Sequence, residues 1–127
     1  MDPRQRPLSP HLQVYKPQLT SVLSILHRAA GVYLAFGLMA LALWIISLGS
    51  TEHCFAAMTS FYDSVLGQLL FASWSTAFFY HFANGIRHLV WDAGCGFELT
   101  AVNKGGWFVL IFTVLASVFF LAMKIGS

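Results

Sequence analysis

Three long stretches without a charged residue constrain the fold of this chain more than any other feature. They cover residues 29–48, 64–86 and 105–123. A helix needs about 20 predominantly apolar residues to cross a hydrocarbon core of about 30 Å, so each stretch is long enough to span a bilayer. Buried strands and core helices of soluble proteins are much shorter. The sequence therefore predicts three transmembrane helices.

The amino-acid composition is typical of a membrane protein. Of its 127 residues, 57% are apolar and only 9% are charged. Soluble domains usually carry about 25% charged residues, so this chain could not cover its surface in water. The net charge of +2 comes from scattered basic residues, which do not form a nucleic-acid-binding patch. We expect a membrane protein with no nucleic-acid partner.

The polar segments between the apolar stretches predict the boundaries of the helices. Pro17 does not fit a helix interior, and Thr20 or Ser21 can cap a helix start. Residues 1–20 are polar and have no apolar core typical of a signal peptide, so we expect a cytoplasmic N-terminal segment there. Residues 21–127 form the predicted three-helix transmembrane domain, with helices at about 21–49, 63–91 and 105–125. The fold class is thus an all-α membrane protein, with a loop at 50–63 and a second, glycine-framed loop before residue 105.

The basic residues predict the orientation of the helices. Six of the seven lie before or early in the first helix or on both sides of the second loop: Arg4, Arg6, Lys16, Arg28, Arg87 and Lys104. The C-terminal tail has only Lys124. The first loop has no Lys or Arg. Positive residues stay on the cytoplasmic side of a membrane, or on the equivalent matrix side. The N-terminus and the second loop are therefore expected to be inside.

His81 is the most informative single residue. It lies inside the second apolar stretch, where an ionisable group is rare and marks a functional site by default. The alternative is a neutral histidine that only packs between helices. Gly85 and His88 follow at i+4 and i+7 and share its helix face. A glycine at that place would let a flat macrocycle approach the helix, which favours His81 as a haem ligand.

A second polar cluster lies at the start of the first helix. Ser24, His27 and Arg28 are spaced i, i+3 and i+4 and therefore share one face. Arginine and serine supply hydrogen-bond donors to the carbonyl oxygens of a quinone, and arginine stabilises the negative charge that develops on its reduction. The simpler interpretation is that Arg28 only reaches the membrane surface and enforces the topology. The shared face favours a quinone site.

Other polar residues carry weaker signals. Arg87 is interpreted as a topology residue that extends to the membrane surface. Asp92 can cap a helix end, pair with Arg87 or lie on a proton path. Trp74 is most simply a packing residue. The sequence contains no CxxCH motif, so covalent attachment of a c-type haem is excluded.

Three segments in this order resemble one family. They are RPLSPHLQVYKPQ at 6–18, SILHRAAG at 24–31 and HFANGIRHLVWDAG at 81–94. Together they resemble the cytochrome b556 subunit of succinate dehydrogenase, the respiratory Complex II. The last two motifs are specific, and the resemblance covers nearly the whole chain. One departure is Ala30, which stands where the family often has Ser or Thr.

The resemblance implies roles for particular residues. His81 matches the axial ligand of the haem iron, and His88 matches a residue near the haem propionates. Ser24 and Arg28 match quinone-site residues, while His27 and Arg28 are close to the propionates in the family. The implied cofactor is a non-covalently bound haem b, and the implied electron acceptor is ubiquinone.

The resemblance also implies partners and a location. A second small membrane anchor subunit gives the other axial histidine, and an iron–sulfur subunit and a flavoprotein complete the complex. The sequence itself supports the second histidine from a partner. His81 is the only deeply placed histidine, so a six-coordinate haem needs a histidine from another chain. The expected location is the bacterial inner membrane, with the mitochondrial inner membrane as the alternative.

Two other functions remain as alternatives at this point. The chain could be a structural or assembly subunit without a redox role, in which case His81 only packs. It could also belong to a small channel or transporter, but the apolar stretches contain no acidic residue, which argues against cation transport. The chain has no flavin or iron–sulfur motif, so we expect it not to be catalytic alone.

Overall fold

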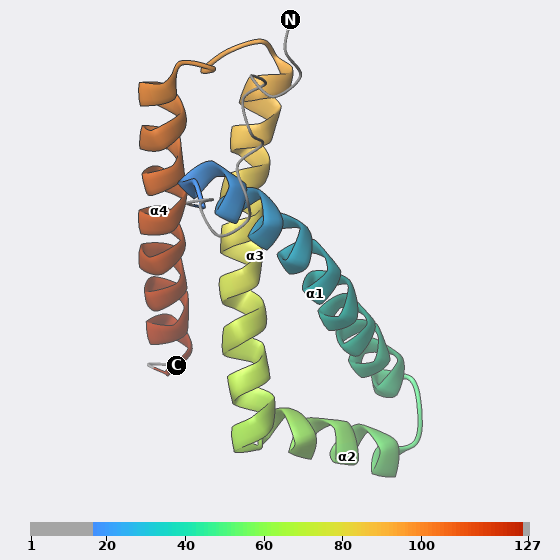
Figure 1. The fold of residues 1–127 in the computed structure, drawn as a ribbon. Coiled ribbons are helices and arrows are strands. Elements are labelled where there is room, and N and C mark those ends of the chain that lie inside the picture. Colours follow the sequence, from blue (N-terminus) through green and yellow to red (C-terminus); the bar gives the residue numbers. More distant parts are fainter. Residues whose placement is uncertain (1–16, 126–127) are drawn as a thin grey trace, which may run out of the picture.

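The computed structural model describes residues 17–125, and these form four α-helices (Figure 1). In chain order they are α1 (Leu19–Leu48), α2 (Glu52–Asp63), α3 (Val65–Asp92) and α4 (Leu99–Ile125). The predicted all-helical class is confirmed. Residues 1–16, which make up most of the predicted N-terminal segment, and residues 126–127 lie outside this description.

Two features differ from the expected helix plan. The predicted loop at 50–63 contains the helix α2, which starts at an N-cap, Thr51, whose hydroxyl accepts a hydrogen bond from Cys54 N at 3.4 Å. Helix α4 begins at Leu99 instead of at 105. The charge of Lys104 ends the uncharged stretch, but it does not break a helix, because lysine is a good helix former. The hydropathy pattern therefore locates the apolar part of α4 but not the residue at which the helix begins.

Local chemistry explains where α3 begins and ends. The Ser64 hydroxyl accepts a hydrogen bond from Gly67 N at 3.1 Å and caps the helix start. Beyond Asp92 the chain turns through Gly94 and Gly96, which have φ values of 80° and 77°. Glycine adopts this left-handed conformation without steric cost. These two glycines form the second loop, as the sequence predicts.

Helix α3 is the central element of the fold. Helix α4 runs beside it, and α1 crosses it near its C-terminal half and then diverges toward α2 (Figure 1). The start of α1 is held against both neighbours, and the buried apolar core lies there: Leu23, Tyr80, Ala83 and Val109. The core is small, so most of the apolar surface is not buried by the chain itself.

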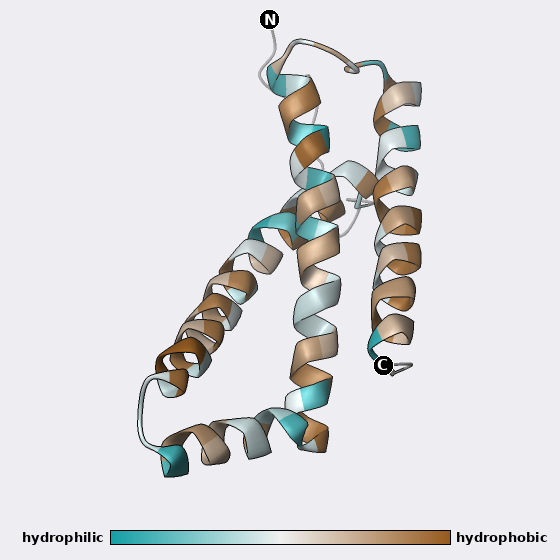
Figure 2. Cartoon of the chain, turned by 180° about the vertical axis from the view of Figure 1, so that it is seen from behind, coloured by the Kyte–Doolittle hydropathy of each residue, from teal (hydrophilic) through white to brown (hydrophobic). Residues whose placement is uncertain are grey.

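Many exposed residues of the long helices are large and apolar. The hydropathy colours of Figure 2 show apolar residues along much of α1 and α4. Helices α1 and α4 are long and apolar enough to cross a membrane, with mean hydropathies of 2.2 and 2.4 in their most apolar windows. Helix α3 is long enough but more polar, because it carries His81, Asn84, Arg87 and His88. Such a surface needs lipid or an apolar partner as its neighbour.

Candidate functional site

The crossing of α1 and α3 brings two of the predicted site residues into direct contact. The imidazole rings of His27 and His81 stack with their centroids 4.0 Å apart and their planes 7° from parallel. Both side chains are half-buried. The predicted face of α3, at residues 81, 85 and 88, is therefore the face that α1 covers.

The hydrogen bond of His81 determines which of its nitrogens is available. Its Nδ1 lies 3.1 Å from the backbone carbonyl oxygen of His27. A carbonyl oxygen only accepts, so this bond requires a proton on Nδ1 and leaves the lone pair on Nε2. Histidines that bind metals are commonly held by such an Nδ1–H to carbonyl bond. The arrangement therefore leaves Nε2 of His81 as the nitrogen that carries the free lone pair.

The glycine that admits His81 is on the opposite helix. A Cβ at Gly31 of α1 would lie 3.0 Å from Cε1 of His81, which is tighter than normal packing. A Cβ at Gly85 would lie 3.8 Å from Cε1 of His27, an ordinary contact. Gly31 therefore admits the imidazole of His81, because the crossing places it directly against that ring. The expected role of Gly85, to let a flat macrocycle approach α3, stays a prediction.

His27 extends the cluster to His88 and Trp91. The ring centroids of His27 and His88 are 5.1 Å apart, and those of His88 and Trp91 are 5.2 Å apart with the rings nearly perpendicular. Nδ1 of His27 is buried and has no hydrogen-bond partner among the described residues. A buried polar atom without a partner is costly, so this nitrogen fits a polar ligand or a group from another chain.

The predicted quinone-site residues flank His27 on α1. Ser24 is half-buried and Arg28 is exposed. Neither side chain forms a hydrogen bond or an ion pair within residues 17–125, and they lie one turn apart, as the sequence predicts. Their donors are therefore available to a ligand at the edge of the histidine cluster.

A second polar stripe on α3 was missed by the sequence analysis. Tyr80, Asn84 and Arg87 precede the histidine stripe by one position and follow the same i, i+4, i+7 spacing. The Tyr80 hydroxyl donates to the Leu23 carbonyl oxygen at 2.7 Å, and Asn84 Nδ2 donates to the same oxygen at 3.4 Å. The signal was present in the sequence, because Asn84 is a polar residue in an uncharged stretch.

The sequence predicts that Arg87 extends outward to the membrane surface, but the structure shows its side chain buried. It is 8% exposed and lies between α3 and α4. Its guanidinium donates to Asn84 Oδ1 at 3.3 Å and to the Val102 carbonyl oxygen at 3.2 Å, and its carbon lies 4.1 Å from the ring centre of Trp91. The early start of α4 brings Val102 within reach. The role of Arg87 in the chain is therefore to join two helices.

The structure also places the two weaker candidates, Asp92 and Trp74. Asp92 is exposed and forms no ion pair with Arg87 within the described range. Trp74 packs against Gly37, where a Cβ would overlap the indole ring, and its Nε1 donates to the Leu34 carbonyl oxygen at 3.4 Å. This tryptophan is a packing residue, as expected.

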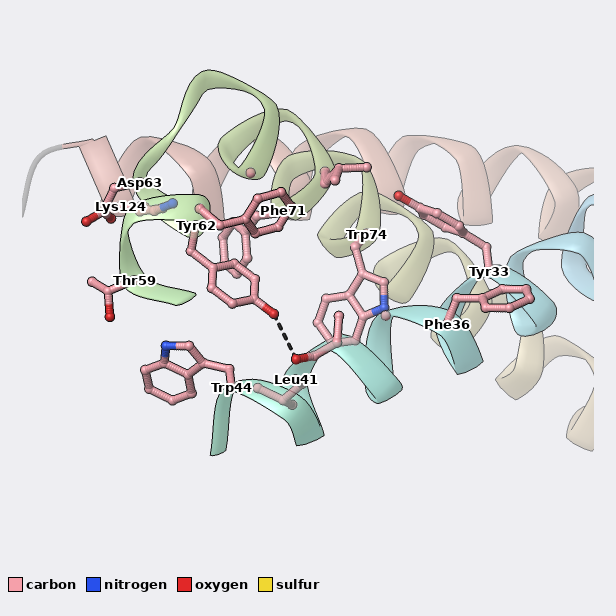
Figure 3. A pocket seen from close by; sticks show the side chains of 15 residues that line it. Tyr33, Phe36, Leu41, Trp44, Thr59, Tyr62, Asp63, Phe71, Trp74 and Lys124 are labelled. Atoms are coloured by element: carbon pink, nitrogen blue, oxygen red, sulfur yellow. Dashed lines mark hydrogen bonds between the residues drawn. The ribbon is translucent and has the colours of Figure 1, made fainter. Parts of the chain in front are cut away.

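A cavity of about 560 Å³ lies away from the histidine cluster, among α1, α2, α3 and the end of α4 (Figure 3). Its walls are mostly aromatic and aliphatic, and include Phe36, Leu41, Phe71 and Trp74. Figure 3 shows Thr59, Asp63 and Lys124 together at one end of it. No histidine lines this cavity, so it is separate from the site that the sequence predicted.

The histidine cluster is not a site for a bare metal ion. Among residues 17–125, no group of three His, Cys, Asp or Glu side chains has the geometry to hold one. The stacked rings of His27 and His81 cannot direct their nitrogens at a single central atom. The site instead offers imidazole nitrogens of His81 and His27 that have no partner in the described chain, a neighbouring cation and a hydroxyl. These groups suit a planar prosthetic group and a small polar head.

Comparison with known proteins gives a consistent result. Residues 2–120 match the family model described as the succinate dehydrogenase/fumarate reductase transmembrane subunit. The succinate dehydrogenase cytochrome b556 subunit of Rickettsia bellii is 46% identical over 90% of this chain and 89% of the relative. The subunit of the same name in Paracoccus denitrificans is 34% identical, over 89% and 87%. The cytochrome b560 subunit of Marchantia polymorpha is 37% identical, over 83% and 80%.

Proposed function

Because this chain belongs to the succinate dehydrogenase/fumarate reductase transmembrane subunit family, we propose that it binds haem b and a quinone as the membrane anchor of a succinate dehydrogenase. In this role it passes electrons from an iron–sulfur subunit to ubiquinone. It is not catalytic alone, because succinate oxidation takes place on other subunits.

The observation that supports this proposal most directly is the hydrogen bonding of His81. Its Nδ1 is bound to the His27 carbonyl oxygen, and Nε2 has no partner within the described chain. We propose that Nε2 of His81 would bind the haem iron. The buried, unpartnered Nδ1 of His27 and the nearby His88 and Arg28 would bind the propionates. The haem supplies a one-electron carrier beside the quinone site.

The other axial ligand would come from a second small membrane subunit. Of the three imidazoles in the cluster, only that of His81 is assigned to the iron, because His27 and His88 are proposed to bind the propionates. A low-spin b-type haem needs two imidazole ligands. The exposed apolar faces of its long helices supply the surface for a shared helical bundle. An iron–sulfur subunit and a flavoprotein complete the proposed complex.

Ser24 and Arg28 are the proposed donors to the quinone head. A long-tailed quinone reaches its site from lipid, and Arg28 is exposed at the side of α1. Arg28 would stabilise the negative charge that develops on the oxygen during reduction, and the Ser24 hydroxyl would hold a carbonyl oxygen. This chain therefore would bind and orient the substrate, while the electrons come from outside it.

We further propose that α1, α3 and α4 all cross the membrane, with α2 lying at its outer face. The polar residues of α3 do not argue against a span, because Tyr80 bonds to α1 and Arg87 bonds to α4. The location would be the inner membrane of a bacterium, with the N-terminus in the cytoplasm. The mitochondrial inner membrane is the alternative, since the family has members in Marchantia polymorpha as well as in bacteria.

Reporter fusions test this topology. A reporter enzyme fused after residue 127 is expected to be active only on the outer face, and one inserted at Phe97 only on the inner face, because Arg28 and Lys104 mark the inner side. Activity of both reporters on the same side would show that α4 does not cross. The reversed pattern would place Arg28 on the wrong side for its electron donor.

A reduced-minus-oxidised absorption spectrum of the purified membrane complex tests the proposed function most directly. A low-spin b-type spectrum that depends on this subunit is the expected result. An assembly subunit without a redox role would contribute no such spectrum, and His81 would then serve only to pack α3 against α1.

A further inference from the structure

One carbonyl oxygen near the start of α1 receives two hydrogen bonds from α3. The acceptor is the backbone oxygen of Leu23, and the donors are Tyr80 Oη at 2.7 Å and Asn84 Nδ2 at 3.4 Å. In a regular α-helix the same oxygen also accepts from the N–H of His27. A carbonyl oxygen has two lone pairs, so the shorter bond from Tyr80 dominates the contact between the helices.

All the groups at this contact are shielded from solvent. Leu23 is 1% exposed, Asn84 is fully buried and Tyr80 is 9% exposed. In such surroundings a hydrogen bond is electrostatically stronger than in water and has a well-defined geometry. The contact therefore ties the first turns of α1 to α3 at one defined point.

The packing around Leu23 holds the same turn from the other side. A Cβ at Gly106 of α4 would lie 3.0 Å from both Leu19 Cδ2 and Leu23 Cδ1, so the start of α1 is pressed closely against α4. Asn84 is in turn held by Arg87, which bonds to Val102 of α4. The turn that begins at Leu23 is thus fixed by both neighbouring helices.

We infer that Tyr80, supported by Asn84, is a positioning residue that places the turn carrying Ser24, His27 and Arg28 against the histidine stripe of α3. This inference rests on the proposed quinone and haem site. Ser24 follows Leu23 directly, and His27 lies one turn later. A shift at the Leu23 carbonyl therefore moves the donors of the site and the carbonyl that orients His81.

The chain offers a matched pair of tyrosines for the test. Tyr80→Phe removes the hydroxyl that bonds to Leu23, which keeps its bond from Asn84. Tyr33→Phe removes a hydroxyl that also joins α1 to α3, through Ser73 Oγ at 2.6 Å, and Ser73 keeps its bond to the Leu70 carbonyl oxygen. Each variant removes one bond between the same two helices and leaves the partner satisfied.

We expect the two variants to differ in the assembled complex. In Tyr80→Phe, kcat/KM for a soluble ubiquinone analogue should fall about threefold to tenfold, the effect of one neutral hydrogen bond. Succinate oxidation by a dye that takes electrons upstream should stay unchanged. Amide hydrogen exchange at residues 24–28 should become faster, because the turn is held less firmly. Tyr33→Phe should match the wild type in quinone reduction and in exchange at residues 24–28.

Equal behaviour of the two variants in both measurements would overturn the inference, since the bond would then only add to the stability of the bundle. Failure of the proposed function is recognised separately, from Arg28→Ala. If Arg28→Ala retains full quinone reduction, the quinone site lies elsewhere. If Arg28→Ala loses activity while Tyr80→Phe behaves like Tyr33→Phe, only the positioning role is refuted.

Discussion

Replacing Arg28 with alanine is expected to lower the succinate–quinone reductase activity of the complex by at least about tenfold. The side chain is exposed beside the histidine cluster, and its guanidinium is not used by the rest of the described chain. A hydrogen bond to a charged group contributes about 1.5–3 kcal/mol, and about 1.4 kcal/mol corresponds to tenfold in rate. Because the reduced head is more negative than the oxidised one, the loss should fall on kcat as well as on binding.

Two further substitutions at the same turn should give graded effects. Arg28→Lys keeps the charge but loses the planar pair of donors, so it should restore part of the activity. Ser24→Ala removes a neutral hydrogen bond and should lower activity less than Arg28→Ala does. This order distinguishes a contribution of charge from a contribution of shape.

The measurement compares two electron acceptors in the same preparation. Reduction of a soluble ubiquinone analogue should fall, while reduction of a dye that takes electrons upstream should stay near the wild-type level. Lys104→Ala is a matched control, since it removes another exposed cation expected on the inner side. Equal loss with both acceptors would indicate failed assembly. Full quinone reduction in an assembled Arg28→Ala complex would refute the site.

Replacing His81 with alanine is expected to abolish the low-spin b-type spectrum of the complex. The substitution removes the imidazole whose Nε2 we propose as a ligand of the iron and whose Nδ1 donates to the His27 carbonyl oxygen. A haem held only by the partner's histidine would be high-spin. The complex should still assemble, because Tyr80, Asn84 and Arg87 hold the helices independently of His81.

Absorption and electron paramagnetic resonance spectra of the purified complex measure this effect. His53→Ala is the matched control, because His53 is an exposed histidine of α2, outside the cluster. His88→Ala should keep the low-spin spectrum, since His88 would contact the propionates and not the iron. An unchanged low-spin spectrum in His81→Ala would show that the axial ligand is another residue, and the proposed arrangement of the site would be wrong.

The sequence by itself determined the helical class of the protein and the residues worth testing. The uncharged stretches located the apolar parts of α1, α3 and α4, because a helix in lipid must be apolar over most of its length. Helical spacing placed residues 81, 85 and 88 on one face, and the structure shows that this face meets His27. These features depend on local periodicity alone.

Helix α2 and the early start of α4 were not predicted, because hydropathy detects the apolar part of a helix and not its capped or polar turns. The true setting of Arg87 depends on that early start, which puts the Val102 carbonyl oxygen beside it. The sequence alone does not distinguish a basic residue that extends to the membrane surface from one that joins two helices, because both lie near the end of a span.

Only the tertiary structure decided how α1 and α3 cross, and this crossing forms the candidate site. Gly31 and Gly37 let His81 and Trp74 approach the backbone of α1, and Tyr80 bonds to the carbonyl oxygen of Leu23. Each of these contacts joins residues at least 37 positions apart in the chain. A periodic pattern shows which face of a helix is polar, but the partner of that face depends on close packing between helices, which local sequence does not encode.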